Sequence, residues 1–197
     1  MNGGIIKKLN KNRTAVLITA ALIVIAFVIG GVRPLGKLRA EGAAVFSGGV
    51  EQIGGRNIEI NIMADLRDYH GKANNAAVIA GRHFDGGINV MTGLQSARTA
   101  LNAEINEKNL EADRLYKAYD GLRRAVKELE LYMAQNNADS AEFRDVISEL
   151  DSLNVIITRQ SAVFNNAASA FNERLGRFPA VIFELTGLVK PLHLFYN

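Results

Sequence analysis

The sequence predicts an all-α protein in which an N-terminal transmembrane helix is followed by an antiparallel up-down helical bundle with long helices. Three observations support this fold class: an uncharged apolar run near the N-terminus, apolar residues that recur every three or four positions afterwards, and only three prolines in 197 residues. A spacing of three and four residues places side chains on one face of an α-helix. No proline lies between Pro34 and Pro179, so long helices can continue there without interruption.

The composition limits the class of protein. With 48% hydrophobic and 22% charged residues, the chain can form one ordinary domain with a core and one extra segment, and it is not a disordered chain. It has no cysteine, which excludes disulfides, thiolate metal sites and a cysteine nucleophile. The net charge of +3 is too small to neutralise many phosphates, so we expect no nucleic-acid partner.

The apolar run predicts a membrane anchor. Residues 1–13 form a basic flank, and residues 14–32 contain no charge and would span roughly 28 Å as a helix, close to the thickness of a hydrocarbon core. The main alternative is a cleaved secretory signal, but the run is longer than a usual signal core and is followed by GGVRPLGKLR rather than by a small-x-small cleavage site. A buried core helix would normally show a polar stripe. We therefore expect residues 14–32 to contact the lipid bilayer.

Basic residues on the two sides of this run predict its orientation. Four basic residues precede the run: Lys7, Lys8, Lys11 and Arg13. Three follow it, Arg33, Lys37 and Arg39, and Glu41 partly offsets their charge. Cytoplasmic flanks carry the excess of lysine and arginine. The prediction is a single-pass protein of the cell membrane with its N-terminus inside and its bundle outside the cytoplasm.

The next two segments are a junction and a first bundle helix. Residues 33–55 form a Gly-rich juxtamembrane segment, and from Gly42 to Gly55 within it we expect a loop or a frayed junction. The bundle is expected over residues 56–179. Its start is ambiguous, because Ile58, Ile60 and Ile62 alternate as in a strand, but the longer pattern steps by three and four and favours a helix from Arg56 to about His83.

Two longer helices are expected after Asp85-Gly86-Gly87. One apolar series runs from Leu94 to Met133 and includes Lys108, whose stem can pack while its amine reaches water. Asp139 or Ser140 then caps a helix that continues until Pro179. Two helices of about 40 residues joined by a short polar turn must lie antiparallel. Three or four helices in all are needed to cover every apolar stripe.

The C-terminal segment, residues 180–197, is apolar but too short between charges to span a bilayer. It could fold back on the bundle or lie at the membrane surface.

The stretch ITRQSAVFNNAASAFNERLGRFPAVIFELTGL resembles the C-terminal part of the LemA family of bacterial membrane proteins. The matching pattern has two aromatic-Asn pairs seven residues apart, then Phe-Pro, then an apolar stretch that reaches a glycine. The matching residues are Arg159, Phe164, Asn165, Phe171, Asn172, Phe178, Pro179 and Gly187. The N-terminal anchor is also similar, whereas the Asp-Leu-Ile-Pro-Asn-Leu-Val segment of the family's first helix is missing. The chain therefore looks like a divergent member.

This resemblance implies an N-terminal transmembrane helix and an antiparallel bundle, with no enzymatic activity or cofactor established for the family. Asn165 and Asn172 each follow an aromatic residue on the same side of one helix. We interpret them as structural, forming hydrogen bonds across the bundle that fix helix register, rather than as ligand contacts.

The sequence shows no catalytic or metal-binding pattern. His70, His83 and His193 share no helix-turn spacing, the Gly-Gly pairs lack the Lys-Ser or Lys-Thr of a phosphate-binding loop, and no nucleophile elbow is present. We expect a structural or interaction module without catalysis, whose partner is another protein or a second copy of the chain. The alternatives are a ligand-sensing or substrate-binding bundle at the membrane surface and a protein that perturbs membranes with its apolar C-terminal segment.

Overall fold

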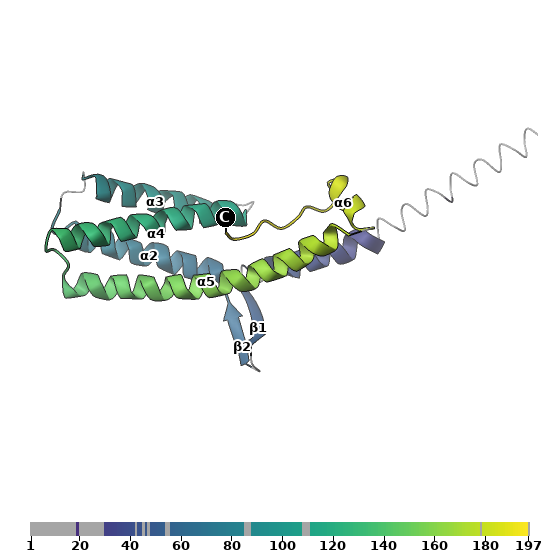
Figure 1. Cartoon of the computed structure of the whole chain (residues 1–197), viewed down its shortest axis with the longest axis horizontal. Helices are drawn as coiled ribbons and strands as arrows, with labels where there is room; N and C mark the ends of the chain where they lie inside the picture. The colour runs from purple at the N-terminus through teal and green to yellow at the C-terminus, as the bar shows by residue number, and fades with distance from the viewer. Residues whose placement is uncertain are drawn as a thin grey trace, which may run out of the picture.

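In the part of the chain that the structure describes, the fold consists of helices and one small β-hairpin (Figure 1). The computed structural model describes residues 19, 30–41, 43, 44, 46, 48–53, 56–84, 88–107, 111–177 and 179–196. Within these residues no helix is both long enough and apolar enough to cross a membrane. The predicted anchor at residues 14–32 lies outside the described residues, apart from Thr19 and residues 30–32.

Four helices form the predicted bundle: α2 (Ile62–Ala80), α3 (Asn89–Ile105), α4 (Ala112–Gln135) and α5 (Ala141–Leu175). Short connections join them, so each helix runs antiparallel to the one before it (Figure 1). α2 packs along α5 and α3 along α4, while α2 also contacts α3 and α4. The prediction of an antiparallel helical bundle is confirmed.

The bundle core is made of the apolar residues that recur every three or four positions. Leu122 and Leu129 on α4 are fully buried, as are Leu94 and Leu101 on α3, so these two apolar stripes are covered by protein. Other buried core residues are Ile62, Leu66, Tyr69, Leu115, Tyr119, Met133, Phe143 and Leu150.

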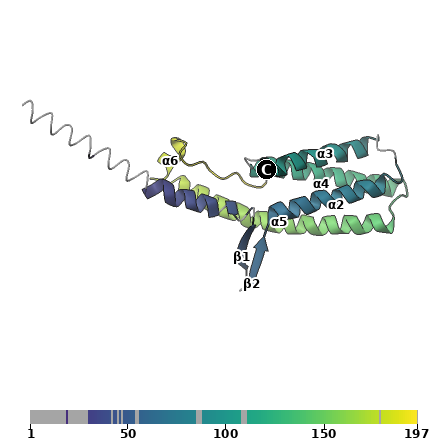
Figure 2. The same cartoon turned by 180° about the vertical axis from the view of Figure 1, so that it is seen from behind.

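α5 is longer than its partners and continues past the bundle. Its C-terminal half lies beside the helix of residues 30–41 on one side and the chain's C-terminal segment on the other, as both views show (Figures 1 and 2). Val32, Leu35 and Leu38 are partly buried and pack against the core, whereas Arg33 and Lys37 are exposed. Packing of this apolar stripe stabilises the helix of residues 30–41. The loop expected from Gly42 to Gly55 is wrong over its described residues, because residues 43, 44, 46 and 48 are helical and Gly49–Ile53 form strand β1.

The interpretation of residues 56–61 as helix is wrong, and the fold is not purely α. Strand β1 (Gly49–Ile53) pairs antiparallel with β2 (Arg56–Ile60), with Gly49 opposite Ile60 and Ile53 opposite Arg56. Gly54-Gly55 separates the two strands, and a two-residue Gly-Gly connection between alternating residues is a hairpin signal. The helix begins only at Ile62, where the Asn61 side chain accepts a hydrogen bond from the Ala64 N–H at 2.9 Å.

The predicted continuous helix from Leu94 to Met133 is also wrong, because it is divided into α3 and α4. The Asn106 side chain donates to the Asn102 carbonyl at 2.7 Å near the end of α3, and Arg114 pairs with Glu104 at 2.9 Å across the connection. The three-and-four spacing continues through the break because both halves are amphipathic, so periodicity alone does not reveal a reversal. Lys108 lies outside the described residues.

The prediction that Asp139 or Ser140 caps α5 is confirmed for Ser140. Ser140 caps α5, since its hydroxyl accepts from the Phe143 N–H at 3.2 Å, and Glu142 lies in the first turn.

Candidate functional site

The candidate site is a groove along the C-terminal half of α5 that contains the chain's own C-terminal segment, residues 188–196, called the tail here. After α5, the short helix α6 (Val181–Leu185) leads into a turn at Gly187, whose φ is +71°. This left-handed conformation suits glycine. The Val189 N–H donates to the Phe183 carbonyl at 3.1 Å, and the tail then runs back antiparallel to α5 (Figure 1).

Two asparagines of α5 hold the backbone of the tail. The Asn172 side chain accepts from the Leu192 N–H at 2.9 Å and donates to the Leu192 carbonyl at 2.8 Å. The Asn165 side chain accepts from the Phe195 N–H at 2.7 Å and donates to the Phe195 carbonyl at 3.5 Å. Each primary amide therefore pairs with both backbone groups of one tail residue, as a neighbouring strand would. We call these two residues the asparagine pair.

The spacing of the asparagine pair matches the spacing of its partners. Seven residues of an α-helix cover roughly 10.5 Å and complete nearly two turns, so Asn165 and Asn172 share one face of α5. Three residues of extended chain, from Leu192 to Phe195, cover about 9–10 Å. A helix with this seven-residue repeat can therefore bind an extended segment at every third residue.

Apolar side chains of the tail follow the same period of three. Val189, Leu192 and Phe195 are buried, while Lys190 and His193 between them are exposed. In an extended segment with about three residues per turn, every third side chain points to the same side. The tail thus presents one apolar edge to the protein, and this pattern could have been read from the sequence.

The ring of Phe195 is the most enclosed group of the tail, at 1% exposure. It packs edge-on against Phe46 and against Tyr116, with ring centroids 5.3 Å apart in both pairs, and stacks on Tyr119 at 6.3 Å. Phe46 also packs edge-on against Phe164 of α5 at 4.9 Å. The aromatic pocket is therefore built from three different helices and closed by the tail.

Charged groups of two other elements also contact the tail. Arg39 donates to the Lys190 carbonyl at 3.1 Å, and the His193 imidazole lies 4.0 Å from an Asp113 carboxylate oxygen. Both contacts are exposed, so they contribute less than the buried ring and the asparagine pair.

A pocket of about 390 Å³ opens beside Phe195, between α4, α5 and the end of the tail. Its wall includes Tyr116, Asn166, Ser169 and Tyr196, and no lining residue is charged. This size falls within the range of small-molecule sites. The uncharged lining suits a neutral group that combines apolar surface with hydrogen-bonding atoms.

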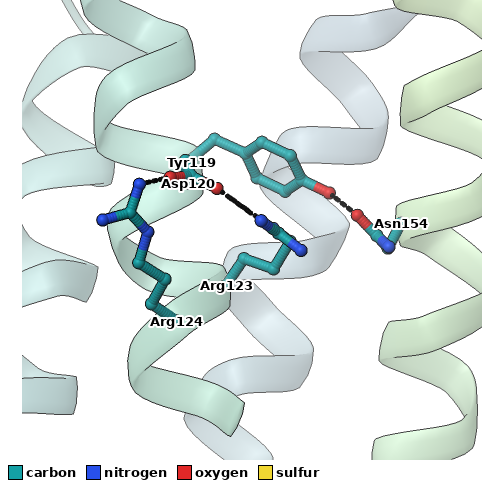
Figure 3. Close-up of polar contacts among 5 residues, drawn as sticks. All are labelled: Tyr119, Asp120, Arg123, Arg124 and Asn154. Carbon is teal, nitrogen blue, oxygen red and sulfur yellow. Dashed lines mark hydrogen bonds and ion pairs between the residues drawn. The ribbon is translucent and has the colours of Figure 1, made fainter.

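Polar side chains of α4 lie next to this pocket, and one of them, Tyr119, bonds to α5 (Figure 3). The Tyr119 hydroxyl donates to the Asn154 side chain at 2.6 Å, and the buried Asp120 accepts from Arg123 at 2.7 Å and also from Arg124. Burial alone would raise the pKa of Asp120, but the hydrogen bonds from the two guanidinium groups outweigh it and hold that pKa below its ordinary value. Burial raises the pKa of Tyr119, so its phenol stays neutral.

The residues of the family-like pattern are distributed along this region. Phe164 and Phe171 are buried in α5, Asn165 and Asn172 form the asparagine pair, and Gly187 makes the turn into the tail. The asparagines bond to the tail backbone rather than across to another helix, which differs from the expected helix-register contact. Arg159 and Pro179 are exposed, and Phe178 lies outside the described residues.

No group of three or more histidine and acidic side chains that could hold a metal ion is found in the part of the chain that the structure describes. Burial and the nearby Arg98 lower the pKa of His70. Comparison of the chain with protein-family models, curated proteins and solved structures found no match to any of them.

Proposed function

We propose that this chain is a single-pass, LemA-like membrane protein whose helical bundle acts as an interaction module, and that the groove on α5 is its binding surface for extended apolar segments. The observation that carries this proposal is the asparagine pair, which bonds both backbone groups of Leu192 and of Phe195. Backbone recognition with pockets for spaced side chains is a common mode of peptide binding.

The groove is suited to a segment rather than to a compact domain surface. It supplies backbone partners at a fixed spacing and one deep aromatic pocket, and apolar anchors in such pockets dominate binding energy. In the isolated chain the tail fills this groove. A protein partner, or the tail of a second copy, would bind the same groups in its place.

The anchor at residues 14–32 is the second part of the proposal. With the N-terminus inside, the groove would face envelope or extracellular partners. Because the chain has no cysteine, a Ser140→Cys variant can be labelled in intact cells with a membrane-impermeant thiol reagent. Labelling in intact cells is expected; protection that disappears only on lysis would place the bundle inside and contradict the proposed orientation.

The groove is tested with a fluorescent peptide of the tail sequence, LVKPLHLFY. The full chain carrying Phe195→Ala, in which the tail loses its main anchor, is titrated with the peptide and followed by fluorescence polarisation. Saturable binding is expected, and it should be lost when Asn165→Leu is added to Phe195→Ala.

The matched control is Asn166→Leu, which changes the same residue type at the next, exposed position. Peptide binding should survive this change. Binding that tolerates Asn165→Leu, or a peptide with alanine in place of its phenylalanine that binds equally well, would contradict the proposed groove.

The uncharged pocket beside Phe195 favours one second candidate, a ligand-binding bundle for small neutral molecules. Substitution of exposed Thr158 by Phe would occupy part of the pocket about two helical turns away from Asn165. If the pocket binds a ligand, cells carrying this variant should resemble cells that lack the protein. The interaction module predicts instead that the variant keeps tail-peptide binding and that such cells behave like wild type.

A further inference from the structure

An exposed apolar cluster lies on α6 and in the turn that follows it. Ile182, Leu185 and Leu188 are 40%, 82% and 54% exposed. A single exposed leucine is ordinary, but three within seven residues at one end of the molecule indicate a contact surface.

The packing of α6 fixes where this cluster lies. The ring of Phe183 is buried directly against Gly31 and leaves no space for a Cβ atom there. Arg39, on the same helix as Gly31, bonds to the Lys190 carbonyl just after the cluster. Figures 1 and 2 show α6 at the end of α5, next to the helix of residues 30–41.

Gly31 also lies within the last positions of the uncharged run at residues 14–32. Gly31, where the chain would leave the bilayer, is therefore in contact with Phe183 of α6. The exposed cluster is held beside the predicted membrane boundary by a buried aromatic contact.

The charges around the cluster are mainly basic. Six basic residues lie on the neighbouring segments, against the three acidic residues Glu41, Glu173 and Glu184; the basic residues are Arg33, Lys37, Arg39, Arg174, Arg177 and Lys190. All six are exposed. Apolar side chains rimmed by basic groups fit the boundary between anionic lipid headgroups and acyl chains.

We propose that α6 and the following turn, residues 181–188, form a second membrane contact, in which Ile182, Leu185 and Leu188 insert into the interface of the bilayer that holds the anchor. This proposal rests on the proposed anchor. The contact would set the orientation of the bundle at the membrane surface, since two separate points of attachment prevent free rotation about the anchor.

The experiment uses tryptophan fluorescence, because the chain contains no tryptophan. The full chain with Leu185→Trp is reconstituted into vesicles of phosphatidylcholine and phosphatidylglycerol, with and without lipids brominated at defined acyl positions. The control is Leu131→Trp, at a residue that is 55% exposed but lies near the other end of the bundle, close to the turn after α4.

The expected result is quenching of the tryptophan at position 185 by shallow bromines, since interfacial helices insert about 5–10 Å below the headgroup boundary. The tryptophan at position 131 should not be quenched. Vesicle flotation is measured on the same samples.

Flotation without quenching at position 185 would overturn this inference and leave the anchor intact. A tryptophan at position 185 that is shielded from aqueous iodide but not quenched by bromine would also overturn it, because another protein surface would then cover the cluster. A chain that does not float with vesicles would overturn both the anchor and this contact.

Discussion

Substitution of Asn172 by leucine should release the tail while leaving the bundle folded. Leucine has the same number and branching of side-chain heavy atoms as asparagine, so it is the hydrocarbon counterpart that lacks the hydrogen-bonding groups. The change removes the acceptor for the Leu192 N–H and the donor for the Leu192 carbonyl, which lie 2.9 Å and 2.8 Å from the amide. No contact between the four bundle helices is altered.

The magnitude follows from these two hydrogen bonds. Each contributes about 0.5–1.5 kcal/mol net, so their loss should destabilise the docked tail by about 1–3 kcal/mol. Every 1.4 kcal/mol is a factor of ten in an equilibrium, so the open state of the tail should become roughly 5 to 150 times more populated. The free energy of global unfolding should change much less, because local opening and global unfolding are separate equilibria.

Amide hydrogen exchange measures this directly. The Leu192 and Phe195 N–H groups should exchange faster by the same factor in Asn172→Leu, whereas the amide of buried Leu66 in α2 should keep its protection. Asn166→Leu, at an exposed position of the same helix, serves as the control and should leave tail exchange unchanged.

Two results would refute this reasoning. Unchanged exchange at Leu192 would mean that the asparagine pair does not hold the tail. Equal acceleration in the tail and in α2 would mean that the tail and the bundle unfold as one unit.

Three further predictions concern the bundle core, the turn and the buried carboxylate. Leu122→Ala should lower the free energy of unfolding in urea by about 2–5 kcal/mol, since Leu122 is fully buried, whereas Leu131→Ala at an exposed position should change it little. Gly187→Ala should accelerate tail exchange, because a φ of +71° costs alanine about 1–2 kcal/mol, and Gly187→Asn should have a smaller effect. Asp120→Asn should lower stability at pH 7 by about 1 kcal/mol. Because the folded pKa of Asp120 lies below its ordinary 3.8, this difference should be present above pH 3.8 and disappear as the pH falls through the folded pKa; a difference that persists in acid would exclude the carboxylate as its cause.

The sequence predicts the parts of this fold that depend on a regular period. The helices over Leu94–Ile105, Leu115–Met133 and Phe143–Leu175 follow from apolar residues at helical spacing, and the cap at Ser140 follows from local hydrogen bonding. The break between α3 and α4 does not follow from this period, because an amphipathic pattern carries no information about reversal of direction.

The hairpin was missed for a different reason. Ile58 and Ile60 belong to a short alternating run that directly precedes a helical pattern, and Ile58 also fits the three-and-four spacing of that helix. The Gly54-Gly55 dipeptide was the decisive local signal.

The candidate site was only partly predictable. Asn165 and Asn172 stand out in the sequence, but their partners are backbone groups of residues 20 and 30 positions away. Backbone groups have no sequence signature, and contacts such as Phe46 with Phe195 depend on the tertiary arrangement of three helices. The period of three in the tail was the signal that could have indicated an extended, docked segment.

The length of α5 has a mechanical consequence. Its 35 residues form one continuous helix about 52 Å long along its axis, with the turn from α4 at one end and α6 near the other. If α6 lies at the bilayer, this helix sets how far the opposite tip of the bundle can reach from the surface. A change in the tilt of α5 at its α6 end would displace the opposite tip of the bundle by many ångströms. The helix would then act as a lever of fixed length.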